Sequence, residues 1–136
     1  MYETFEHTAD LGLRVRASDL ENLFIDAARG LTSMVVANID QVRRVRQVTL
    51  EVPGTRHDEL LFDWLTEILY AFESQRLLLS EFQVRLGDSG LSAIAEGERV
   101  DESRHQLEHE VKAITYHGLR VDQTPDGWLA EVIVDI

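Results

Sequence analysis

The sequence contains no cysteine, only one lysine and two prolines. Without cysteine, the chain forms no disulfide, no thiolate zinc site and no cysteine nucleophile, which fits a reducing compartment. No run approaches the roughly 18 apolar residues of a membrane span. The first residues also lack the basic and then apolar pattern of a signal peptide. We therefore expect a protein with no membrane association that stays in the cytoplasm.

Familiar enzyme motifs are also missing. The sequence has no Gly-rich phosphate loop, no Gly-x-Ser-x-Gly elbow and no His-Glu-x-x-His zinc helix. Its 13 basic residues face 25 acidic ones, which gives a formal charge of −12. Such a surface repels phosphate backbones, so strong direct binding to nucleic acid is not expected. Metal ions or a basic protein surface are more plausible partners, and solubility alone is the plain alternative.

The 136 residues, 44% of them apolar, fit one domain (residues 1–136) with a sizeable core. Alternation over residues 11–17 predicts a strand. Apolar residues at helical spacing then predict a helix that ends near residues 37–38. Its start is expected at Ser18, because Ser18 and Glu21 have capping-box spacing. Residues 42–52 suggest a second strand.

A wide apolar stripe predicts a second helix that begins near Asp58. The stripe consists of Leu60, Leu61, Trp64, Leu65, Ile68, Leu69 and Phe72. Further strands are expected at 82–86, 91–96, 111–117, 119–122 and 128–136, with a loop at 97–108. These patterns predict a single α+β domain in which two main amphipathic helices pack on antiparallel β-hairpins.

The last residues are the first candidate site. Asp135 lies next to the α-carboxylate of Ile136, and the apolar run before it indicates that this end is held in a strand. A third carboxylate nearby would complete an oxygen-rich pocket suited to a hard cation. The plain alternatives are a solvated charge at a frayed end for Asp135 and a turn-capping role for Asp10.

Three other polar features have both structural and functional interpretations. Lys112 either points outward, pairs with Glu110, or balances a carboxylate cluster. His105 and His109 have the spacing of a helical metal pair, but they fall in a polar loop without matching ligands, so solvated histidines are favoured. The arginines within residues 43–46 protect an edge strand from aggregation or, as a weaker interpretation, contact RNA or a partner.

Three segments together resemble the archease family. They are His7-Thr-Ala-Asp10-Leu-Gly, then Leu61-Phe-Asp-Trp64-Leu-Thr-Glu-Ile-Leu-Tyr70, then Val111-Lys-Ala-Ile-Thr-Tyr-His117 with the ending Val-Ile-Val-Asp135-Ile136. The resemblance spans essentially the whole chain. It implies a strand-helix-strand-strand core with an insertion. It also implies a non-catalytic accessory protein that activates an RtcB-type RNA ligase in tRNA splicing and RNA repair, by promoting guanylylation of the ligase and multiple turnover.

Carried over residue by residue, the family's metal site falls on Asp10, Asp135 and the terminal carboxylate of Ile136, with calcium as the associated ion. His7 and Lys112 are expected beside it. Three crowded carboxylates repel one another, so a cation or Lys112 would be needed to hold them together. Two other functions stay open: a chaperone-like adaptor for RNA-modifying enzymes and, less favoured, a metal-dependent hydrolase with His7 as its general base.

Overall fold

The computed structural model describes residues 1–7 and 10–136. Within these residues the chain forms eight strands, two α-helices and one short 3-10 helix. Their bounds are β1 Tyr2–His7, β2 Asp10–Ala17, α1 Leu20–Val35, η1 Ile39–Gln41, β3 Arg46–Pro53, α2 His57–Gln75, β4 Leu77–Gly87, β5 Gly90–Arg99, β6 Ala113–Ile114, β7 Arg120–Thr124 and β8 Gly127–Asp135. No helix in this part of the chain is long and apolar enough to cross a membrane.

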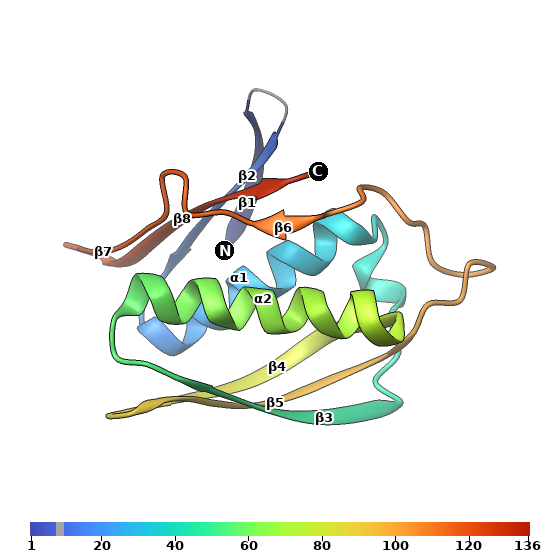
Figure 1. Cartoon of the computed structure of the whole chain (residues 1–136), viewed down its shortest axis with the longest axis horizontal. Helices are drawn as coiled ribbons and strands as arrows, with labels where there is room; N and C mark the ends of the chain where they lie inside the picture. Colours follow the sequence, from blue (N-terminus) through green and yellow to red (C-terminus); the bar gives the residue numbers. More distant parts are fainter. Residues whose placement is uncertain (8–9) are drawn as a thin grey trace.

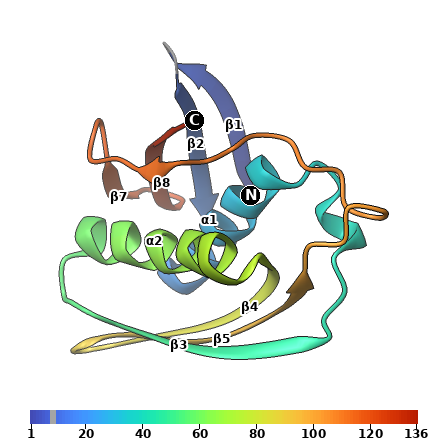
Figure 2. The ribbon, with the colours of Figure 1, turned by 45° about the vertical axis from the view of Figure 1, so that its right-hand side comes forward.

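The two helices lie between two antiparallel sheets (Figure 1). The first sheet has the order β1-β2-β8-β6, and β7 also pairs with β8. The second sheet has the order β3-β5-β4. Figure 2 shows the same layers from another side, with α1 and α2 lying between the sheets. The predicted α+β class, with two main helices on antiparallel hairpins, is confirmed.

The chain order explains how the two sheets arise. The consecutive elements β3, α2, β4 and β5 follow the order strand, helix, strand, strand and form the three-stranded sheet by themselves. This unit is inserted after β2 and α1, and the chain then returns to the first sheet to add its last strands. Around this insertion, β2, α1, β7 and β8 also follow the order strand, helix, strand, strand, so the predicted core and its insertion are both present.

The core lies where the helices meet the inner faces of the sheets. Leu13 of β2 and Val132 of β8 are fully buried there. At the centre, Trp64 of α2 is fully buried and its indole Nε1–H donates to the carbonyl oxygen of Phe24 in α1 at 3.0 Å. The predicted stripe of α2 is confirmed, since six of its seven residues are buried and Phe72 is half-buried.

The first helix starts one residue later than its capping pattern predicted. Asp19 is the N-cap, and its carboxylate accepts a hydrogen bond from the backbone N–H of Asn22 at 2.8 Å. Glu21 does not close a capping box with Ser18. Its carboxylate instead accepts from the backbone N–H of Leu86 at 2.9 Å, which ties the helix to β4. A tertiary contact has replaced the local one.

One strand of the structure was not predicted, and one predicted strand is shorter than expected. The first strand, β1, lacks a clean apolar alternation because Phe5 faces the outer side of the sheet, where its ring covers Gly12. The predicted strand at 111–117 is reduced to β6, and Thr115, the next residue, still bonds to β8. Its backbone N–H and its hydroxyl both donate to the carbonyl of Ile133, at 3.1 and 2.8 Å.

Candidate functional site

Asp10 and Asp135 are direct cross-strand partners at the end of the first sheet. Directly opposed residues point to the same face of a sheet, with Cβ atoms about 4.5 to 5.5 Å apart. Their neighbours Leu11 and Val134 pack against the core, so the two aspartates occupy the outer face. The register also sets His7 opposite Asp10 and Ala113 opposite Asp135. The register thus brings together two carboxylates from opposite ends of the sequence.

An open groove of about 590 Å³ crosses this end of the sheet. It is lined by Glu6, Asp10, Leu11, Glu108, His109, Glu110, Lys112 and Ile136. We call it the acidic groove. It unites three of the predicted residues, Asp10, Lys112 and Ile136, while Asp135 stands exposed on the strand that ends beside it. The side chain of His7 and residues 8–9 of the His7-Thr-Ala-Asp10 motif lie outside the described residues.

The wall of the groove is fixed by backbone hydrogen bonds. The N–H groups of Glu108 and His109 donate to the carbonyls of Val35 and Met34, at 2.8 and 3.0 Å. These carbonyls belong to the last turn of α1, where no intrahelical donor remains. Three residues after His109, the N–H of Lys112 donates to the carbonyl of Asp135 at 2.7 Å. The segment that carries the groove's polar side chains is therefore attached both to α1 and to β8.

Two basic side chains elsewhere on this outer face, those of Arg14 and Arg120, are engaged in ion pairs. Glu131 of β8 accepts hydrogen bonds from Arg14 at 2.9 Å and from Arg120 at 2.8 Å. Burial alone would raise the pKa of Glu131, but its hydrogen bonds to Arg120 and Arg14 hold the pKa below its ordinary value. Arg14 is four residues along β2 from Asp10, about 14 Å at 3.4 Å per residue. Lys112 is the ammonium group that lines the groove itself.

The donor chemistry of the acidic groove fits a hard cation. Carboxylate oxygens are the ligands that calcium prefers, and two directly opposed carboxylates repel each other unless a positive charge lies near. Within residues 1–7 and 10–136, no three His, Cys, Asp or Glu side chains are grouped so that they could hold a metal ion. The implied ligand set needs only two side chains, because its third carboxylate is that of the chain end.

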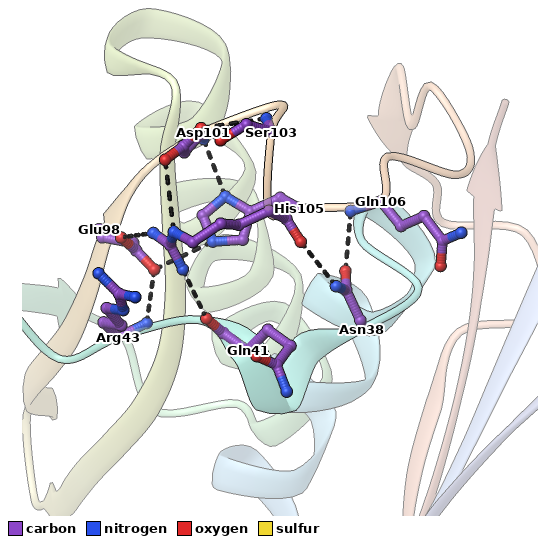
Figure 3. A network of polar contacts seen from close by, with 9 residues as sticks. Asn38, Gln41, Arg43, Glu98, Asp101, Ser103, His105 and Gln106 are labelled. Atoms are coloured by element: carbon purple, nitrogen blue, oxygen red, sulfur yellow. Dashed lines mark hydrogen bonds and ion pairs between the residues drawn. The ribbon is translucent and has the colours of Figure 1, made fainter.

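His105 differs from its expected solvated state. It is only 4% exposed and belongs to a buried polar network around Glu98, which is 7% exposed (Figure 3). The Nδ1 atom of His105 accepts from the backbone N–H of Asp101 at 2.9 Å. This leaves the proton on Nε2, which donates to Glu98 Oε2 at 3.0 Å. His109, by contrast, is exposed and lines the acidic groove.

Glu98 is the centre of that network. Its carboxylate also accepts from the backbone N–H of Arg43 at 2.7 Å and from the guanidinium of Arg104. Burial alone would raise the pKa of Glu98, but the hydrogen bonds from Arg43, Arg104 and His105 hold the pKa below its ordinary value. On the other side, Asn38 donates to the carbonyl of Arg104 and accepts from the N–H of Gln106, both at 2.8 Å (Figure 3). The network thus fixes the loop that leads into the groove wall.

Sequence reasoning did not predict two acidic residues of the groove, Glu6 and Glu108. Glu6 belongs to the strand that the pattern did not reveal, and Glu108 comes at the end of a loop that has no periodicity. The position of Glu108 is set by its neighbour Leu107, which forms an isolated β-bridge with Val36. No local pattern encodes a contact of that range.

The fold and the groove define a small α+β protein with two helices between antiparallel sheets and a carboxylate-lined groove where the chain ends. The model of the Archease protein family matches residues 2–136. The chain belongs to this family. It is 35% identical to Protein archease of Pyrococcus furiosus, over 99% of this chain and 98% of the relative. It is 37% identical to that of Methanopyrus kandleri, over 99% of each.

Two solved structures share the fold. The solution structure of Methanobacterium thermoautotrophicum protein 1598 has a TM-score of 0.87 and 30% identity, and the match covers 99% of this chain and 98% of that one. A crystal structure from Thermotoga maritima, described as an archease and possible chaperone, has a TM-score of 0.70 and 21% identity, with 100% and 98% covered. The Thermotoga likeness supports the fold alone.

Proposed function

We propose that this protein activates an RtcB-type RNA ligase in tRNA splicing and RNA repair, by promoting guanylylation of the ligase and its repeated turnover. The protein is an accessory factor and does not itself make or break the RNA bond. Membership of the archease family supports this proposal. The observation that carries it further is the pairing of Asp10 with Asp135 beside a groove that also contains Lys112 and Ile136. Such work would take place in the cytoplasm.

In this proposal, Asp10, Asp135 and the terminal carboxylate of Ile136 hold a calcium ion or another hard divalent cation. The bound ion would supply positive charge that attracts phosphate oxygens. Lys112 stands beside it, on a segment whose backbone is bonded to Asp135, and offers a second cation at the same place. The proposal also places His7 next to the site, because its backbone is paired with Asp10.

The test is ligation of a broken tRNA by the cognate ligase under single- and multiple-turnover conditions. Adding the protein is expected to restore multiple turnover. Asp135→Asn, and a variant with one residue added after Ile136, are expected to lose this stimulation with the fold intact by circular dichroism. Asp88→Asn removes one exposed carboxylate from the β4–β5 turn, away from the groove, and serves as the matched control.

Full stimulation by the extended variant would contradict the role of the terminal carboxylate and would favour a chaperone-like adaptor that needs no metal. A separate assay addresses the hydrolase alternative. The isolated protein, incubated with nucleotides and phosphoesters in the presence of calcium, is expected to show no turnover, because an accessory factor acts only through its partner.

A further inference from the structure

The solvent-facing side of α2 is unusual in its charge. It carries four acidic residues and one tyrosine, namely Glu59, Asp63, Glu67, Tyr70 and Glu73, all of them exposed. Their spacing of three and four residues places them on one stripe, opposite the buried stripe of the same helix. We call this stripe the α2 surface. In Figures 1 and 2 the outer side of α2 is not covered by any other element.

This arrangement is unfavourable for the helix by itself. Glu59 and Asp63, and then Asp63 and Glu67, are like charges four residues apart, and each such pair costs a helix about 0.2 to 0.5 kcal/mol. No lysine or arginine lies within His57–Gln75 to offset them. Among the ion pairs of the described residues, the one that reaches the stripe joins Arg56 to Glu59, at 3.7 Å. The charge of the α2 surface is therefore largely uncompensated within the protein.

Aromatic rings extend the same surface. Tyr70 is 61% exposed at its centre. At its border, Tyr116 stacks on Phe62 of α2 with ring centroids 4.0 Å apart and planes 7° apart, and Tyr116 is still 66% exposed. The turn that presents Tyr116 is fixed by the two hydrogen bonds of Thr115 to Ile133. Carboxylates interspersed with open aromatic faces match arginine, whose planar guanidinium pairs with the former and stacks on the latter.

The α2 surface is connected to the acidic groove. Lys112 lines the groove and Tyr116 borders α2, and the four residues from one to the other span at most about 14 Å. A single protein partner can therefore contact both places at once. A nucleic acid is repelled by this surface, and so is a second copy of a chain with formal charge −12.

We infer that the α2 surface, together with Tyr116, is a docking site for an arginine-bearing face of a protein partner, in addition to the acidic groove. This inference rests on the proposed function and deepens it, because it assigns the affinity for the ligase largely to α2 and the stimulation of the ligase to the groove. Charge complementarity across an interface mainly governs association and its dependence on salt.

The experiment measures the dissociation constant of the cognate RtcB-type ligase for the protein at about 50 mM and about 300 mM salt. The double variant Asp63→Asn/Glu67→Gln is expected to bind about tenfold more weakly at low salt and to show a flatter salt dependence. At saturating concentration it should still stimulate the ligase fully, because the groove is unchanged. Tyr70→Ala is expected to weaken binding about threefold to tenfold through loss of the stacked guanidinium.

The matched control is Glu51→Gln/Asp88→Asn, which makes the same change of net charge at exposed positions of the three-stranded sheet. It should bind within about twofold of the unmodified protein. Equal weakening by both double variants, or none by Asp63→Asn/Glu67→Gln, would overturn the docking site while leaving the proposed function in place. If the unmodified protein neither binds nor stimulates the ligase, both fail. Self-association or RNA binding that depends on Asp63 and Glu67 would also overturn the inference.

Discussion

Asp10 on β2 and Asp135 on β8 face one another across adjacent strands, although 125 residues separate them in the chain. Like charges directly opposed in a sheet are destabilising. The pairing is therefore a local cost to stability that a bound cation would relieve. The same pairing fixes the geometry of the candidate site, because it depends only on the register between the two strands.

Removal of one charge of this pair is expected to stabilise the protein when no divalent cation is present. In the presence of a chelator, Asp135→Asn should raise the free energy of unfolding by about 0.2 to 1 kcal/mol. With calcium in excess, the unmodified protein should instead be more stable than the variant, because an ion that binds only the folded state stabilises that state by mass action. Urea denaturation with chelator and with calcium measures both effects. An unmodified protein whose unfolding is indifferent to calcium would argue against the site.

Glu98 is expected to make the fold sensitive to acid. Glu98→Gln should lower the free energy of unfolding by about 2 kcal/mol at pH 7. The reason is that the donors Arg43, Arg104 and His105 would lose their hydrogen bonds to a charged carboxylate. The folded pKa of Glu98 lies below its ordinary value. The stabilisation by its carboxylate is therefore complete above the unfolded pKa, near 4.5, and is lost as the pH falls through the folded pKa.

Denaturation curves of both proteins from pH 7 down to about pH 3 test this directly. The difference between the unmodified protein and Glu98→Gln should shrink as the pH falls below about 4.5. A difference that stays constant over this range would show that the charge of Glu98 does not carry its contribution. Glu51→Gln, at an exposed position, is the control for general effects of acid.

The sequence predicted those parts of the fold in which one periodicity dominates. The stripe from Leu60 to Phe72 specifies α2 because its spacing fits only a helix with one buried face. The strand β1 was not predicted, since Phe5 is apolar on the outer face and breaks the alternation. His105 was expected in solvent because its loop is polar. It is buried because Glu98 and the backbone N–H of Asp101 together satisfy the hydrogen bonds of its ring.

Sequence reasoning identified only those residues of the candidate site that lie in recognisable segments. Asp10, Asp135, Ile136 and Lys112 come from segments that resemble a known family, and the register of β2 and β8 brings the two aspartates together. Glu6 and Glu108 join the groove only through tertiary contacts. One depends on the pairing of β1, and the other on hydrogen bonds to carbonyls at the end of α1. Such contacts leave no trace in local periodicity.

The contact of Phe5 with Gly12 supports the hairpin that carries Asp10. A Cβ at position 12 would lie 2.1 Å from the Phe5 ring, so Gly12→Ala must displace that ring. We expect a loss of about 1 kcal/mol, at the lower end of the range for overpacking, because the half-buried Phe5 ring can shift on the outer face. In a Phe5→Ala background the same change should be neutral or stabilising, because alanine costs less entropy than glycine in a strand. A double-mutant cycle by urea denaturation measures the coupling, and additive effects would contradict it.

The N-cap of α1 is Asp19 in the structure, whereas the capping-box pattern predicted Ser18. Asp19→Ala is expected to lower the free energy of unfolding by about 1 kcal/mol, because it removes the acceptor for the N–H of Asn22. The hydrogen bond from the N–H of Asn22 is the main reason that the pKa of Asp19 lies below its ordinary value. The destabilisation by Asp19→Ala should therefore be complete above the ordinary pKa of Asp19 and should fade as the pH falls through its pKa in the folded protein. Ser18→Ala, the residue that the capping-box pattern favoured, should be nearly neutral. If urea denaturation found the larger loss for Ser18→Ala, the helix would begin where the local pattern placed it. The hydrogen bond from the N–H of Leu86 to the carboxylate of Glu21 would then not form in solution.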